Sequence, residues 1–159
     1  MKTVEIAYRY DGAEASLRER PNDAEAARMR LNDGNRSFAE LFTRVEEGTG
    51  TSRRIVPIDP RDLGLLPDGA GSLQQRPFAA ILGCADARVP IELIFNEGPN
   101  DLFVVRVAGN TLGDDVRGSL NYAIDHLGDS LKLIVVLGHS ACGAVAAAVF
   151  SSSRRSPPP

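Results

Sequence analysis

Several features that are absent or scarce in the sequence exclude whole classes of protein. No apolar run approaches the roughly 20 residues that a membrane-spanning helix needs. The N-terminal stretch MKTVEIAYRYDG lacks the apolar core of a signal peptide. The formal net charge is only −3, which argues against nucleic acid or an anionic membrane as the main partner. We therefore expect a cytoplasmic protein that binds neither nucleic acid nor a membrane.

Cysteine is also scarce, with two residues in a chain of 159. Two cysteines far apart in the sequence of a cytoplasmic protein are more often ligands, catalytic thiols or plain core residues than a disulfide. No glycine-rich phosphate loop follows the first strongly apolar segment, which disfavours a nucleotide-binding protein. The rest of the composition, 43% hydrophobic and 25% charged, is typical of one soluble globular domain.

The N-terminal half gives weak signals. Residues 1–21 show no clear period and are interpreted as an N-terminal tail. Residues 22–47 predict a helical arm that begins at Asn22 or Asp23 and breaks into two pieces at Gly34. Residues 48–76 are rich in Gly, Pro and Asp and are interpreted as a loop or linker.

A regular pattern follows over residues 77–150, which we expect to form the core. Three apolar runs, 78–84, 101–109 and 131–139, predict strands that are covered on both faces. Segments with helical features follow each of them, and this alternation predicts a parallel β-sheet flanked by helices, the α/β class. Residues 151–159, SSSRRSPPP, are expected to be a disordered tail.

Reactive side chains gather at the ends of two of these strands. Cys84 ends the first strand, and Asp86 and Arg88 follow it at alternate positions. His139 ends the third strand, and Cys142 follows three residues later. Ligands of open α/β sheets bind at the carboxyl ends of the strands. If the first and third strands are neighbours, Cys84, His139 and Cys142 can meet there. Two thiolates and an imidazole suit a catalytic zinc with an open fourth position, although plain core cysteines or a disulfide remain open alternatives.

The motifs CADAR and GHSACG resemble those of the β-class carbonic anhydrases, C-x-D-x-R followed by H-x-x-C. Residues 88–110, RVPIELIFNEGPNDLFVVRVAGN, and residues 31–38, LNDGNRSF, also resemble segments of that family. The resemblance implies that Cys84, His139 and Cys142 bind one Zn²⁺ per chain. It implies that Asp86 and Arg88 form the catalytic dyad, with Asp86 as a fourth zinc ligand in a closed state. The substrate pocket implied by the family comprises Gln75, Phe103 and Tyr122.

The implied activity is the zinc-dependent, reversible hydration of carbon dioxide to bicarbonate and a proton. The family further implies a homodimer or a higher homo-oligomer, in which the N-terminal helices wrap the neighbouring subunit. Family members continue beyond the H-x-x-C helix, so the chain is similar to a C-terminally shortened member. A non-catalytic zinc-binding remnant of the same fold is therefore the main alternative. A related hydrolase that acts on a substrate such as CS2 is another.

Overall fold

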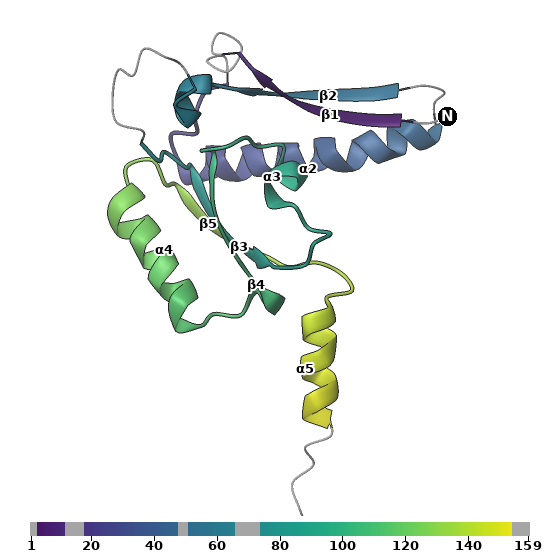
Figure 1. Ribbon diagram of the computed structural model, residues 1–159, viewed down its shortest axis with the longest axis vertical. Helices are drawn as coiled ribbons and strands as arrows, with labels where there is room; N and C mark the ends of the chain where they lie inside the picture. Colours follow the sequence, from purple (N-terminus) through teal and green to yellow (C-terminus); the bar gives the residue numbers. More distant parts are fainter. Residues whose placement is uncertain (1–2, 12–17, 48–50, 66–73, 154–159) are drawn as a thin grey trace, which may run out of the picture.

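The computed structural model describes residues 3–11, 18–47, 51–65 and 74–153. Its central sheet consists of β3 (Ala79–Cys84), β4 (Leu102–Val107) and β5 (Leu133–Leu137), in the order β4-β3-β5 (Figure 1). Both pairings are parallel, so the three strands end at the same edge of the sheet. Every residue of the middle strand, β3, is buried. The predicted α/β class is confirmed. The first and third core strands, β3 and β5, are neighbours, which is the condition for Cys84, His139 and Cys142 to meet.

Helices connect and follow these strands. The short helix α3 (Ile91–Phe95) follows β3, and the 3-10 turn η2 (Ala108–Asn110) follows β4. Helix α4 (Asp114–Leu127) covers the sheet on the way to β5. The buried core joins β3 and α3 to a longer N-terminal helix, α2 (Ala24–Glu47). It consists of Ala27, Leu31, Phe78, Ala79, Ile81, Ile91 and Phe95.

Helix α2 (Ala24–Glu47) is continuous, so the prediction of a break at Gly34 is wrong. Asp23 caps its first turn as expected, because its Oδ1 accepts a hydrogen bond from the Ala26 N–H at 2.7 Å. Gly34 does not interrupt the helix but allows it to pack closely against α3. A Cβ atom at this position would lie 1.7 Å from the carbonyl oxygen of Phe95 in α3. Glycine therefore lets α2 approach the backbone of α3.

A second, two-stranded sheet corrects both predictions for the N-terminal half. The predicted tail contains β1 (Thr3–Tyr10), and the predicted loop or linker contains β2 (Thr51–Ile58) and the 3-10 turn η1 (Pro60–Leu63). The two strands pair in parallel, and α2 forms the crossover beside them (Figure 1). Their sequences, TVEIAYRY and TSRRIVPI, mix polar and apolar residues because neither strand is fully buried. Residues 1–2, 12–17, 48–50 and 66–73 lie outside the described residues.

One buried carboxylate ties the N-terminal segments to the core. Glu97, after α3, is 1% exposed and accepts a hydrogen bond from Arg18 Nη2 at 2.8 Å. It also accepts from Nε and Nη2 of Arg30 in α2, at 2.9 and 2.5 Å. Burial raises the pKa of Glu97, while the hydrogen bond from Arg30 opposes this shift. The three side chains connect the segment before α2, α2 itself and the segment that leads to β4.

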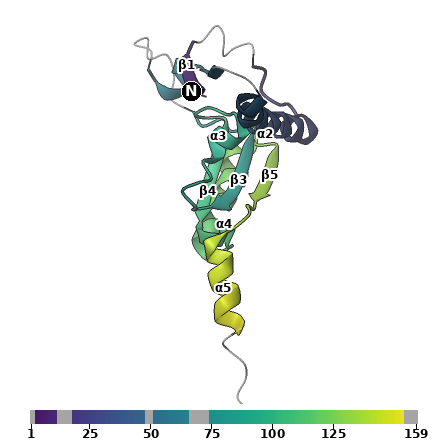
Figure 2. The same ribbon diagram turned by 90° about the vertical axis from the view of Figure 1, so that its right-hand side faces the viewer.

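The last helix, α5 (Gly143–Ser153), extends away from the sheet (Figure 2). It includes Ser151, Ser152 and Ser153, so the prediction of disorder is wrong for these three residues. Serine is only moderately unfavourable within a helix and does not stop it as proline does. Residues 154–159 lie outside the described residues. Among the helices that the structure describes, none is both long and apolar enough to cross a membrane.

Candidate metal centre

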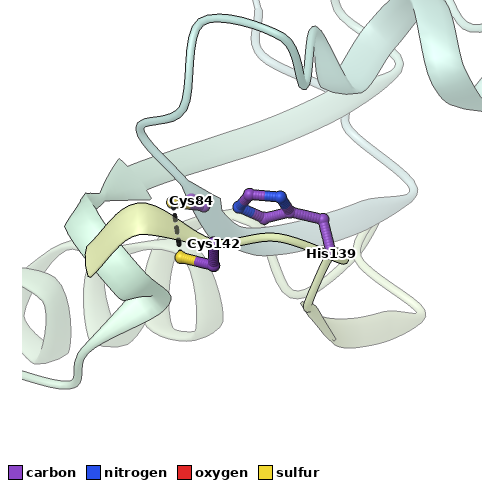
Figure 3. A group of neighbouring side chains, drawn as sticks. All are labelled: Cys84, His139 and Cys142. Atoms are coloured by element: carbon purple, nitrogen blue, oxygen red, sulfur yellow. Dashed lines mark hydrogen bonds between the residues drawn. The ribbon is translucent and has the colours of Figure 1, made fainter. Parts of the chain in front are cut away.

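Three elements bring Cys84, His139 and Cys142 to one place at the carboxyl edge of the sheet (Figure 3). Cys84 is the last residue of β3, and His139 lies just after the neighbouring strand β5. Cys142 directly precedes α5. Between His139 and Cys142, Ala141 adopts a left-handed conformation with φ of 55°. One ligand atom from each of the three side chains lies within 4.8 Å of the others, as the sequence predicted.

The separation of the two sulfur atoms fits a tetrahedral zinc ion. Zinc–sulfur bonds of about 2.3 Å at a tetrahedral angle place two sulfur atoms about 3.8 Å apart. The Sγ atoms of Cys84 and Cys142 are 3.8 Å apart. A disulfide needs about 2.05 Å, and both cysteines are free thiols in this structure.

The imidazole of His139 is oriented as a metal ligand. Its Nδ1 lies 3.0 Å from the carbonyl oxygen of Ser140, which can only accept, so Nδ1 carries the proton and donates. Nε2 then has a free lone pair, and this buried atom makes no hydrogen bond within the described residues. An unpaired buried nitrogen is costly unless something binds it. A metal ion between Nε2 and the two thiolates would satisfy this nitrogen.

The surroundings of Cys84 favour the thiolate, the form that binds metals. The pKa of Cys84 is lowered to about 6, chiefly by His139, whose imidazole can donate a hydrogen bond to the sulfur when it is protonated. A hydrogen bond from the Gly109 N–H to the sulfur, at 3.3 Å, acts in the same direction. Cys84 in turn raises the pKa of His139. In the metal-free protein, this thiol ionises closer to neutrality than an ordinary cysteine does.

Asp86 and Arg88 form a tight pair beside these ligands. Arg88 donates from Nε and Nη2 to the two carboxylate oxygens, at 3.0 and 2.7 Å, and from its backbone N–H to Oδ1 at 2.9 Å. These hydrogen bonds hold the pKa of Asp86 well below its usual range. Arg88 Nη2 also donates to the Ala141 carbonyl at 3.1 Å, and Asp86 Oδ2 lies 4.0 Å from His139 Nε2. An ionised carboxylate therefore faces the candidate metal position.

Two contacts to Cys84 come from residues outside the predicted set, Gly109 and Arg106. Arg106 in β4 donates from Nε to the Cys84 carbonyl at 3.0 Å and from Nη2 to the Asp86 carbonyl at 2.5 Å. The signal in the sequence is a single charge within the otherwise apolar strand LFVVRV. Gly109 has φ of 68°, a conformation that glycine adopts readily.

The three residues expected to line the substrate pocket lie elsewhere in the chain. Phe103 pairs with Ala80 near the start of β3, whereas Cys84 is at its end. The Phe103 ring contacts Tyr122 of α4, with centroids 6.2 Å apart, and both rings line an open hollow. Gln75 lines another hollow near His126. Neither hollow contains Cys84, His139 or Cys142, so a single chain does not bring the two groups together.

Fold and site together define an α/β protein with a Cys–His–Cys site suited to a metal at the carboxyl edge of its sheet. The family model described as carbonic anhydrase matches residues 79–158. Carbonic anhydrase 2 from Mycobacterium tuberculosis is 53% identical over 75 residues, which cover 47% of this chain and 35% of that protein. A carbonic anhydrase from Mycolicibacterium smegmatis is 51% identical over 73 residues, covering 46% and 34%.

A crystal structure of a tetrameric β-carbonic anhydrase from Sordaria macrospora superposes with a TM-score of 0.47 at 33% identity, covering 57% of this chain and 42% of that one. The chain belongs to the β-carbonic anhydrase family. It spans about a third of the length of the two mycobacterial relatives, 35% and 34%.

Proposed function

We propose that this protein catalyses the zinc-dependent, reversible hydration of carbon dioxide to bicarbonate and a proton. The observation that carries the proposal is the group Cys84, His139 and Cys142 beside the ionised Asp86. We assign one Zn²⁺ per chain to the first three residues. When bound, zinc lowers the pKa of a water ligand to near 7 and so supplies hydroxide at neutral pH. A reducing compartment such as the cytoplasm keeps both thiols available as ligands.

The remaining chemistry falls to Asp86 and Arg88. Asp86 Oδ2 is close to His139 Nε2, so it can accept a hydrogen bond from the reacting water and orient it. Arg88 keeps the carboxylate ionised and fixes its plane through two parallel hydrogen bonds. For Asp86 to become a fourth ligand in a closed state, its carboxylate must leave these bonds. We propose that Arg88 thereby favours the open state.

We further propose that the substrate pocket is completed by a second copy of the chain, in a homodimer or higher homo-oligomer. Gln75, Phe103 and Tyr122 lie apart from the metal ligands of their own chain. If they line the pocket, a second copy has to supply them. Subunit mixing tests this: Cys142→Ala and Gln75→Ala are each expected to be inactive alone. Random mixing at equal amounts restores about a quarter of the parent activity if sites are shared between two copies. No recovery in verified mixed dimers contradicts the shared site.

Stopped-flow carbon dioxide hydration combined with zinc analysis tests the activity itself. The parent is expected to hold zinc near one per chain and to be active. Cys142→Ala is expected to lose zinc, whereas Asp86→Asn keeps zinc and loses activity. Arg117→Gln, on the exposed surface of α4, is the matched control and keeps both. Zinc near one per chain without hydration would favour the non-catalytic remnant, and turnover of CS2 alone would favour the related hydrolase.

A further inference from the structure

The segment that carries Asp86 leaves the sheet immediately after Cys84. The last backbone hydrogen bond between this segment and β4 runs from the Ala85 N–H to the Val107 carbonyl, at 3.1 Å. Beyond Ala85 the chain turns toward α3. The position of Asp86 relative to Cys84 therefore depends on contacts other than the strand ladder.

Arg106 supplies such a contact from the neighbouring strand. It pairs with Gly83 in the sheet register, one residue before Cys84. Its guanidinium donates to the carbonyls of Cys84 and Asp86 at 3.0 and 2.5 Å, so one rigid planar group bridges both residues. The Asp86 carbonyl also accepts from the Val89 N–H at 3.1 Å, which closes the turn. Arg88 holds the carboxylate of Asp86, and Arg106 holds its backbone.

We propose that Arg106 is a positioning residue that fixes the Asp86 carboxylate relative to the Cys84 thiolate. This inference rests on the proposed function, which assigns Cys84 to zinc and Asp86 to the reacting water. Arg106 touches neither the metal position nor the reacting atoms and acts through the two backbone carbonyls. Groups that orient metal ligands commonly change metal affinity by 10–100-fold. Arg106 is exposed, so water competes for its hydrogen bonds and we expect an effect of about tenfold, the low end of that range.

Arg106→Gln, Arg106→Lys and the control Arg117→Gln test this role. In Arg106→Gln we expect zinc to pass to a chelator about tenfold faster than in the parent. The visible absorption spectrum of the Co²⁺-substituted protein should change, because the ligand geometry changes. We expect kcat to fall more than KM rises, because orientation of the reacting water matters in the transition state. Arg106→Lys should recover only part of each effect, since an ammonium lacks the planar fork, and Arg117→Gln should match the parent.

Hydrogen exchange on the metal-free proteins separates this proposal from the proposed function. In Arg106→Gln the amides of Ala85, Arg88 and Val89 should exchange at least several-fold faster than in the parent, with the sheet amides unchanged. A parent chain that takes up neither Zn²⁺ nor Co²⁺ refutes the proposed function. In that case, the comparison of hydrogen exchange between Arg106→Gln and the parent decides by itself whether Arg106 positions Asp86. Unchanged exchange, together with zinc release within about twofold of the parent where metal is bound, overturns the proposal.

Discussion

The contact between Gly34 of α2 and the backbone of α3 yields a sharp prediction about stability. In Gly34→Ala, the new methyl group would lie 1.7 Å from the Phe95 carbonyl oxygen, and real contacts of this kind lie beyond 3.0 Å. Both sides of the contact are backbone, so α2 and α3 must separate by more than an ångström. Overpacking of this kind typically costs 1–3 kcal/mol. Because neither side of the contact can rotate away, we expect a cost at the top of this range, about 3 kcal/mol. Alanine recovers up to about 1 kcal/mol of helix propensity, so the expected net loss is about 2 kcal/mol.

The same substitution at Gly118 is the matched control. Gly118 lies within α4, and no described atom outside its own helix and neighbours comes within 4 Å of a Cβ built there. Gly118→Ala should therefore gain up to about 1 kcal/mol from helix propensity. The free energy of unfolding from urea titrations, followed by circular dichroism, measures both variants. If Gly34→Ala is as stable as the parent while Gly118→Ala shows its expected gain, the close-contact argument is refuted.

Three further results are expected. Glu97→Ala leaves Arg18 and Arg30 without their buried partner and should lower the free energy of unfolding by about 3 kcal/mol. A loss below about 1 kcal/mol in urea titrations would contradict this expectation. Ile91→Ala removes a fully buried side chain and should cost about 3 kcal/mol, measured in the same way, whereas a near-neutral result would mean that the core can collapse around the gap. In metal-free Cys142→Ala, ultraviolet absorbance should show the Cys84 thiol ionising near pH 6, below the ordinary value of 9.0. Because the pKa is lowered, the thiolate is lost as the pH falls through about 6. Adding His139→Ala should move the midpoint upward, because His139 is the largest cause of the lowered pKa. A midpoint that stays near 6 would contradict this role of His139.

The parts of the fold that could be read from the sequence are those specified by short-range patterns. β3 is apolar at every position because it is covered on both faces. Because β3 and β5 are parallel neighbours, their carboxyl ends meet at one edge of the sheet, and this brings Cys84 close to His139. Gly34 illustrates the opposite case. A glycine in a helical pattern is compatible with a break or with close packing, and only the position of Phe95, 61 residues further on, decides between them.

For a related reason, the sequence does not reveal β1 and β2. Thr3 pairs with Thr51 across an intervening helix, and the side chains of the two strands do not alternate cleanly because both strands are only partly buried. Local patterns record burial, so a marginally buried strand leaves little trace in them. The pocket residues form a third case. Only the resemblance to the family assigns Gln75, Phe103 and Tyr122 to the substrate pocket, and their role in catalysis stays a prediction.

The buried carboxylate of Glu97 limits how the two halves of this chain can be recombined with those of relatives. The family match begins at residue 79, yet Glu97 within that part depends on Arg18 and Arg30, which lie before it. A chimera that kept this core and borrowed its first 78 residues from another protein would have to import two correctly placed guanidinium groups. Without them, the chimera would bury the negative charge of Glu97 with no positively charged partner, however well the catalytic motifs were preserved.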